Sequence, residues 1–183
     1  IRSSAYPDTH PQVKKALLLS IPILTYGEAL RDIFNQKKGI LVTGTHGKTT
    51  STAMLGRVLE NANFDPTVVV GGELLEWSRT ARAGKSEWMV AEGDEYQAKI
   101  LMLRPHILLL TNIEYDHPDF YENEEAYRNT FRSLLNSLPR ESKVVAHESL
   151  ESFVLESTKA EVTIFGRKTD HEIQSAFKLK VCG

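Results

Sequence analysis

The sequence is poor in cysteine, in net charge and in long apolar runs. Cys182 is the only cysteine among 183 residues, which excludes an internal disulfide framework and fits a reducing compartment such as the cytoplasm. The net charge of −2 leaves no basic excess of the kind that nucleic-acid-binding proteins carry. No apolar run approaches the roughly 20 residues needed to cross a membrane. We therefore expect a cytoplasmic protein with neither nucleic acid nor a membrane as partner.

What is present is the composition of an ordinary globular protein. Hydrophobic residues make up 41% and charged residues 25% of the chain, and this length is enough to bury a substantial core. The first residue is Ile1 and no charged-then-apolar leader follows it. We therefore expect a piece of a longer protein rather than a secreted precursor.

Short apolar runs alternate with helical patterns along most of the chain. The expected strands lie at residues 40–42, 67–70, 88–91, 107–110, 143–146 and 162–165. The expected helices lie at residues 50–63, 124–138 and 150–157. Continuous apolar strands separated by helices are typical of parallel sheets that are buried on both faces. The sequence therefore predicts an α/β fold with a mostly parallel sheet and helices on both faces.

The start of the chain has a different pattern. Helical spacing is expected at residues 13–19 and 27–34, and one brief apolar strand is expected between them at residues 20–24. The polar connector at residues 35–39 is a candidate boundary. We predict a leading segment at residues 1–36 and a main domain at residues 37–183, although residues 1–36 fit an arm of a single domain equally well on composition alone.

A turn with two glycines follows the strand expected at residues 40–42. It reads Gly44-Thr45-His46-Gly47-Lys48-Thr49-Thr50. The N–H groups and the dipole at the start of the next helix favour a bound phosphate. Lys48 can reach the terminal phosphates of a nucleotide, and Thr49 can offer its hydroxyl to Mg²⁺. The first glycine of a standard phosphate loop would fall at Val42, so the match is incomplete, but we predict a nucleotide-phosphate site rather than an ordinary turn.

Two further polar clusters follow expected strands. Residues 92–96 read Glu-Gly-Asp-Glu-Tyr, and residues 111–117 read Thr-Asn-Ile-Glu-Tyr-Asp-His. Ligands of parallel sheets bind beyond the carboxyl ends of the strands, so both clusters are expected to meet the loop. Glu92 and Thr49 would then offer oxygen ligands to Mg²⁺, whereas a solvated acidic turn is the alternative interpretation.

His117 ends the second of these clusters. Its place at a strand end suggests a metal or phosphate role, and the preceding Asp116 is positioned in the sequence to orient the imidazole by accepting its other N–H.

Together these stretches resemble the Mur ligase family, whose members build the peptide stem of bacterial cell-wall precursors. The loop resembles the family's nucleotide loop. The histidine at position 46 is similar to the residue found in the branch that adds L-alanine, and in its relative that reattaches a recycled tripeptide. Residues 91–96 resemble the A-E-A-D-E-S/Y segment, and residues 111–117 resemble the T-N-I/L-E-x-D-H segment.

The resemblance also implies a domain assignment. Residues 1–36 would be the end of the N-terminal UDP-sugar domain, and residues 37–183 would be the ATP-binding central domain, incomplete at its C-terminal end. The family's later G-x-H-N-x-x-N stretch, which frames the adenine, would follow residues 178–183. The resemblance also implies that most of the UDP-sugar domain and the C-terminal domain that binds the incoming amino acid are not in this chain, so we expect the chain alone to be inactive as a ligase.

The same resemblance implies roles for the site residues. The residues that would bind ATP are Gly44, Thr45, His46, Gly47, Lys48, Thr49, Thr50 and Asn112. Thr49, Glu92 and His117 would hold Mg²⁺, with Lys48 and His117 as the catalytic residues. The implied reaction is ATP-dependent amide formation through an acyl phosphate, joining L-alanine to UDP-N-acetylmuramate.

Several alternatives stay open. Tyr96 stands where many members have serine, and it favours the tripeptide-reattaching relative. Gly93 stands in place of the usual alanine. No lysine lies between His117 and Arg140, where many family members carry a modified lysine. From the residues alone, the chain also fits another P-loop kinase or NTPase, or a nucleotide-binding module without catalytic activity.

Overall fold

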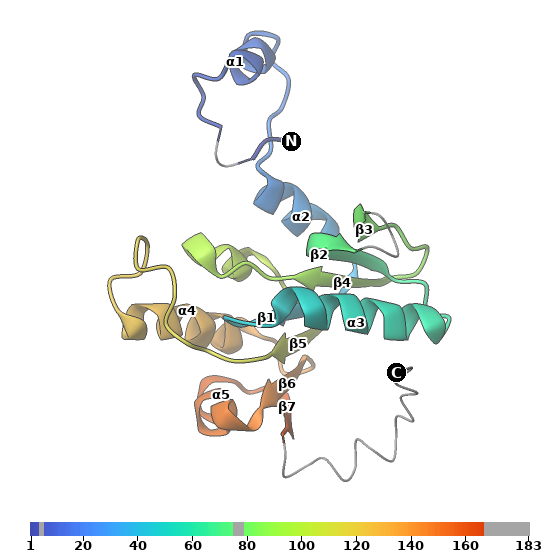
Figure 1. The fold of residues 1–183 in the computed structure, drawn as a ribbon, viewed down its shortest axis with the longest axis vertical. Coiled ribbons are helices and arrows are strands. Elements are labelled where there is room, and N and C mark those ends of the chain that lie inside the picture. The colour runs from blue at the N-terminus through green and yellow to red at the C-terminus, as the bar shows by residue number, and fades with distance from the viewer. Residues whose placement is uncertain (4–5, 75–78, 167–183) are drawn as a thin grey trace.

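One sheet organises the structure. The computed structural model describes residues 1–3, 6–74 and 79–166, so Cys182, Ser4, Ala5 and the stretch 178–183 lie outside the described residues. Within the described residues, seven strands form the sheet in the order β3-β2-β4-β1-β5-β6-β7 (Figure 1). They are β1 (Lys38–Thr43), β2 (Thr67–Leu74), β3 (Arg79–Arg82), β4 (Trp88–Glu92), β5 (Ile107–Leu110), β6 (Lys143–His147) and β7 (Glu161–Phe165). Only the pair of β2 and β3 is antiparallel among them, which confirms the mostly parallel sheet.

The described helices are α1 (Pro11–Leu18), α2 (Tyr26–Phe34), α3 (Lys48–Asn61), α4 (Glu124–Ser137) and α5 (Glu151–Ser157), with short 3₁₀ segments at η1 (Tyr96–Met102) and η2 (Glu148–Leu150). α1 lies away from the sheet, whereas α3 and α4 pack against it (Figure 1). In the described part of the chain, no helix combines the length and apolar character needed to span a membrane.

The strands have two apolar faces because successive side chains of a strand point to opposite sides. On β1, Ile40 and Val42 belong to a buried cluster against which residues of α3 pack, whereas Leu41 belongs to a second cluster with residues of α4 and α5. Figure 1 shows α3 on one side of the sheet and α4 on the other. The prediction of helices on both faces is confirmed.

The register of β1 positions the site. β1 lies between β4 and β5, and Val42 is level with Glu92 on β4 and with Leu109 on β5. All three strands run parallel, so their carboxyl ends reach the same edge of the sheet. The segments that follow them therefore meet there.

The strand expected at residues 20–24 is not formed. These residues connect α1 to α2 without strand structure, and the nearest pairing is an isolated bridge between Arg2 and Thr25. Ile21 is 52% exposed, and Pro22 has no N–H to donate to a ladder. An apolar run forms a strand only when a partner strand satisfies its backbone, and here the pairing is limited to the contact of Arg2 with Leu24 and Thr25, where Arg2 N donates to Leu24 O at 2.8 Å.

β3 was not expected from the sequence. The segment Arg79–Arg82 has no apolar run, and it joins the sheet by antiparallel pairing with β2. Arg82 secures this edge, because its guanidinium donates to Asp65 Oδ1 at 2.5 Å and to Glu60 Oε1 at 3.0 Å. The hydrogen bond from Arg82 lowers the pKa of the Asp65 carboxyl.

α2 belongs to the packed structure although it lies before the predicted boundary. Its first turn is capped reciprocally, since the Thr25 hydroxyl accepts from Glu28 N and the Glu28 carboxylate accepts from Thr25 N. At its other end Phe34 is fully buried in the cluster that contains Leu41. A Cβ on Gly39 would lie 2.3 Å from the Phe34 ring. The boundary at residue 36 stays a prediction, but Phe34 joins the two predicted parts.

This packing predicts a large loss of stability when Phe34 is truncated. The variant Phe34→Ala should lower the free energy of unfolding by about 3–5 kcal/mol, because it empties a closed site. On the same helix Ile33 is 52% exposed, so Ile33→Ala should change it by less than about 0.5 kcal/mol. Urea unfolding of both variants measures the difference. A loss for Phe34→Ala as small as that for Ile33→Ala would mean that Phe34 does not anchor α2 to the core.

Candidate phosphate and metal site

The loop between β1 and α3 holds two glycines in conformations that other residues rarely adopt. Gly44 has a φ of 131° and Gly47 a φ of 78°, where a side chain would be strained. A Cβ on Gly44 would lie 2.3 Å from the Thr111 hydroxyl oxygen, whereas one on Gly47 would meet nothing within 4 Å. Gly47 therefore faces open space at the start of α3. The first N–H groups of a helix have no partner within it, so this opening suits an anion.

The segment after β5 holds the loop in place. Asn112 Oδ1 accepts from His46 N at 2.8 Å, and Asn112 Nδ2 donates to His46 O at 3.0 Å. The Thr111 hydroxyl donates to the same carbonyl at 2.8 Å. The Asn112 side chain thus contacts the loop backbone through both of its polar atoms. Its expected contact with ATP remains a prediction, and its observed contacts position the loop.

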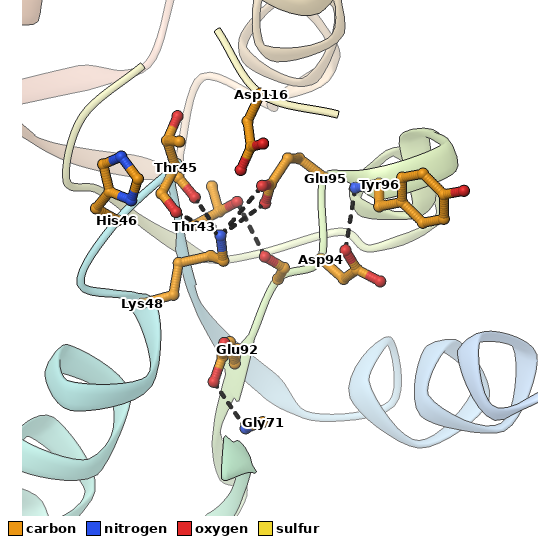
Figure 2. Close-up of polar contacts among 12 residues, drawn as sticks. Thr43, Thr45, His46, Lys48, Gly71, Glu92, Asp94, Glu95, Tyr96 and Asp116 are labelled. Carbon is orange, nitrogen blue, oxygen red and sulfur yellow. Dashed lines mark hydrogen bonds and ion pairs between the residues drawn. The ribbon is translucent and has the colours of Figure 1, made fainter. Parts of the chain in front are cut away.

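Lys48, the first residue of α3, folds back across the loop (Figure 2). Its Nζ donates to Gly44 O at 2.7 Å and to Thr45 O at 2.9 Å. It also donates to Glu95 Oε1 at 3.1 Å. Glu95 Oε2 is 3.0 Å from Nζ, within ion-pair distance but outside hydrogen-bond geometry. Lys48 therefore lies at the predicted site with a buried carboxylate as its counter-ion.

Glu95 was not among the predicted site residues. Its side chain is only 1% exposed, and Oε1 also lies 3.4 Å from the Tyr127 hydroxyl and 3.6 Å from His117 Nε2. The sequence placed Glu95 in an acidic cluster at a strand end, but no spacing rule tells which carboxylate of such a cluster turns inward. The structure makes Glu95 the residue that joins Lys48 to His117.

A short irregular segment at Gly93 separates the two glutamates of this cluster. Gly93 N donates to Val42 O at 2.8 Å, and the Thr43 hydroxyl donates to Gly93 O at 3.2 Å. A Cβ on Gly93 would lie 2.9 Å from Leu41 Cδ1 and 3.1 Å from Ile100 Cγ2. The segment at Gly93 therefore packs closely against β1 and η1. It lets Glu92 stay at the end of β4 while Glu95 turns toward Lys48.

Tyr127 of α4 joins the same network from the side of the core. Its hydroxyl lies 2.8 Å from Thr45 Oγ1, and the side chain is fully buried. The Thr45 hydroxyl also donates to Glu114 O and accepts from Glu114 N, both at 2.8 Å. Burial raises the pKa of the Tyr127 phenol far above its usual value, and the nearby Glu95 charge raises it further. The phenol therefore stays protonated and available as a donor.

Glu92 and Thr49 lie side by side, as the sequence suggested. The Thr49 hydroxyl donates to Glu92 Oε1 at 3.0 Å, and Glu92 Oε2 accepts from Gly71 N at 2.7 Å. Figure 2 shows Glu92 beside Gly71, away from the Glu95 carboxylate. A hydroxyl and a carboxylate at the start of α3 are hard oxygen ligands, which suit Mg²⁺. These residues fit a magnesium ion next to a bound phosphate.

His117 lies with Glu95 and Asp116 rather than in contact with Glu92. One ligand atom from each of His117, Glu95 and Asp116 lies within 4.8 Å of the others. Asp116 Oδ1 accepts from the backbone N of His117 at 2.7 Å, but Oδ2 is 3.8 Å from Nε2. The expected hydrogen bond from the imidazole to Asp116 is therefore not formed. This donor set also fits a divalent cation, and it is separate from the Thr49–Glu92 pair.

An aromatic side chain covers one face of His117. The Tyr96 ring lies 4.9 Å from the imidazole, centroid to centroid, and its hydroxyl donates to Asp119 at 2.8 Å. His117 has a φ of 58°, an uncommon value for a residue other than glycine. The contact with Tyr96 and the bond to Asp119 hold the segment after β5 against η1.

A cavity of about 520 Å³ opens beside Glu92. Arg2, Tyr26, Asp94 and Lys99 are among the residues that line it, so both the leading segment and the strand ends contribute. Burial raises the pKa of the Tyr26 phenol, and the charges of Glu92 and Asp94 raise it further. The cavity therefore combines acidic and basic groups next to Glu92.

The fold and the loop define an α/β domain whose first helix after the loop begins at an open position, at the carboxyl ends of its strands, that suits a phosphate. Sequence comparison is more specific. The sequence pattern of the Mur ligase middle domain matches residues 42–181, which is most of the chain. The chain therefore belongs to the Mur ligase family.

Individual relatives agree with this assignment. The chain is 40% identical over 139 residues to UDP-N-acetylmuramate--L-alanine ligase of Aquifex aeolicus, covering 76% of this chain and 31% of that protein. It is 44% identical over 138 residues to the ligase of the same name from Dictyoglomus turgidum, covering 75% and 30%. The chain thus spans less than a third of the length of either relative.

Solved structures match the fold. The UDP-N-acetylmuramate-alanine ligase of Thermotoga maritima superposes with a TM-score of 0.72 at 30% identity, covering 83% of this chain and 36% of that one. The UDP-N-acetylmuramate:L-alanyl-gamma-D-glutamyl-meso-diaminopimelate ligase of Neisseria meningitides superposes with a TM-score of 0.75 at 27% identity, covering 90% and 57%.

The raised pKa of Tyr127 predicts a pH dependence of stability. Above about pH 10 the unfolded chain loses the phenol proton while the folded chain keeps it. The free energy of unfolding should therefore fall as pH rises, by up to about 1.4 kcal/mol per pH unit from this residue. Tyr127→Phe should remove that part of the slope. Denaturant unfolding of both proteins between pH 9 and pH 11, roughly the range around the usual tyrosine pKa, measures it, and parallel curves would contradict the assignment.

Proposed function

We propose that this chain is the ATP-binding part of an ATP-dependent amide ligase that joins L-alanine to UDP-N-acetylmuramate. The observation that carries the proposal is the meeting of Lys48, the Thr49–Glu92 pair and His117 at one edge of the sheet. Curated relatives that are 40% and 44% identical to it over 139 and 138 residues are named as L-alanine ligases.

The phosphates of ATP would bind over the loop at Gly47, at the open start of α3. There the backbone N–H groups and Lys48 would offset their charge. Thr49 and Glu92 would hold a magnesium ion, and His117, with Asp116 beside it, would hold a second cation. A bound magnesium ion would neutralise charge on the transferring phosphoryl group.

The proposed reaction has two steps. A carboxylate oxygen of UDP-N-acetylmuramate attacks the γ-phosphorus of ATP, forming an acyl phosphate while the bond to ADP breaks. The amine of L-alanine then attacks the acyl carbon, which forms the amide and releases phosphate and a proton. Chemistry of this kind depends on positioning and charge neutralisation rather than on a protein nucleophile. The cavity beside Glu92 offers the carboxylate substrate a route to the γ-phosphate.

A second candidate amine is the recycled tripeptide. Tyr96 favours it, because the sequence resemblance associates tyrosine at this position with the tripeptide-reattaching branch. The structural likeness to the Neisseria ligase, whose name includes a tripeptide, covers 90% of this chain. In either case the substrates are a nucleotide sugar and ATP, so we propose a cytoplasmic location, with no nucleic acid or membrane as partner.

Phosphate release by the full-length protein that contains this chain tests the proposal. With ATP, UDP-N-acetylmuramate and L-alanine together, phosphate should appear, and omission of any one of them should abolish it. Replacing L-alanine by the tripeptide distinguishes the two candidate amines. Phosphate release that needs neither amine nor UDP-N-acetylmuramate would favour an NTPase instead.

Lys48→Ala should lower the rate of ligation by at least about 100-fold, as expected for loss of a group that offsets charge in the transition state. A matched control is Lys143→Ala. Lys143 is 60% exposed and begins β6, at the edge of the sheet opposite the strand ends, so its loss should leave ligation unchanged. Full activity of the Lys48 variant would overturn the assignment of the loop.

A further inference from the structure

Lys48 already has a full set of hydrogen-bond acceptors. Its Nζ donates to Gly44 O, Thr45 O and Glu95 Oε1 at distances of 2.7, 2.9 and 3.1 Å. A lysine ammonium group has three donor hydrogens, so these acceptors use all of them. A nucleotide phosphate can bind Lys48 only by displacing at least one acceptor.

Among these acceptors, only Glu95 carries a charge. The Glu95 side chain is 1% exposed and that of Lys48 is 17% exposed, so water screens their attraction weakly. Within the described residues Glu95 Oε2 has no hydrogen bond, which makes Lys48 the principal partner of the carboxylate. A buried carboxylate that loses its closest cation is strongly disfavoured. Glu95 therefore opposes any movement of Lys48 toward a ligand.

We propose that Glu95 is a positioning residue that competes with the nucleotide phosphates for Lys48; this inference rests on the proposed ATP site. Without nucleotide, Glu95 holds the lysine folded back across the loop. When phosphates bind, Lys48 turns toward them. As the nucleotide product dissociates, Lys48 forms its ion pair with Glu95 again, and this competition increases the dissociation rate of the product.

Two side chains lie close enough to donate hydrogen bonds to the Glu95 carboxylate when Lys48 moves away from it. The Tyr127 hydroxyl lies 3.4 Å from Glu95 Oε1, and His117 Nε2 lies 3.6 Å from the same oxygen. Tyr127 comes from α4 and His117 from the segment after β5, so the carboxylate is approached from two sides. A small shift of either side chain gives a shorter hydrogen bond. The exchange of partners is therefore possible without moving Glu95 into water.

A second ion pair near the loop provides a contrast. His46 and Glu114 lie 3.5 Å apart, but their side chains are 66% and 68% exposed. Exposed charges are screened by water and salt. Neutralising Glu114 should therefore have little effect on a phosphate bound nearby, and Glu114→Gln is a matched control for the removal of one negative charge.

The test is nucleotide affinity of the full-length protein, measured by calorimetry with ATP and with ADP. Glu95→Gln keeps the shape of the side chain and removes its charge. The dissociation constants of both nucleotides should fall by about ten-fold, because a charge-assisted hydrogen bond to Lys48 is replaced by a weaker neutral one. The KM for ATP should fall as well, without an increase in kcat. Glu114→Gln should leave the constants within about two-fold of the wild-type values.

A double variant shows whether the effect passes through Lys48. In a Lys48→Ala background, Glu95→Gln should change the ADP dissociation constant by less than about two-fold, because the competition no longer exists. If the affinity still rises ten-fold there, Glu95 acts directly on the phosphates, and the inference is wrong.

Weaker or unchanged nucleotide binding by the Glu95→Gln single variant would also overturn the inference, since it would mean that Glu95 prepares Lys48 for phosphate or has no influence on it. If Glu95→Gln does not fold, Glu95→Asp tests the inference instead. Its side chain is one methylene shorter, so the carboxylate lies farther from Lys48, and the affinity for ATP and ADP should again increase. Failure of the proposed function has a different signature, namely a wild-type protein that binds no ATP.

Discussion

The parallel register of β4, β1 and β5 is the constraint on which the site depends. Val42 is level with Glu92 and with Leu109, so three polar segments begin at one edge of the sheet. The buried apolar strands fix this register, because a slip by one residue would exchange the side chains that fill the two apolar clusters on opposite faces of the sheet. The chemistry of the site is thus set by residues that take no part in it.

The ion pairs of the site differ in strength because they differ in burial. Glu95 and Lys48 are largely shielded from water, whereas His46 and Glu114 are mostly exposed. In a poorly hydrated environment a single ion pair can decide where a lysine points, but a solvated pair cannot. The network that includes Thr45 and Tyr127 extends this control to α4, because the Tyr127 hydroxyl contacts the loop directly.

Much of the architecture follows from the sequence, because long apolar runs and a glycine loop between strand and helix are local signals. The strands around the site and the contact of Thr49 with Glu92 could be predicted in this way. Residues 20–24 have the same kind of apolar run but lack a partner strand. Glu95 could not be distinguished from its acidic neighbours, since its direction depends on how the segment at Gly93 packs.

Close packing at residue 93 limits which side chains this position can carry. A Cβ there would lie 2.9 Å from Leu41 Cδ1 and 3.1 Å from Ile100 Cγ2. Leu41 Cδ1 is the end of a flexible side chain, so an alanine requires only a small displacement of its neighbours. A larger side chain would push the backbone between Glu92 and Glu95 away from β1 and would thereby alter the spacing of the two carboxylates.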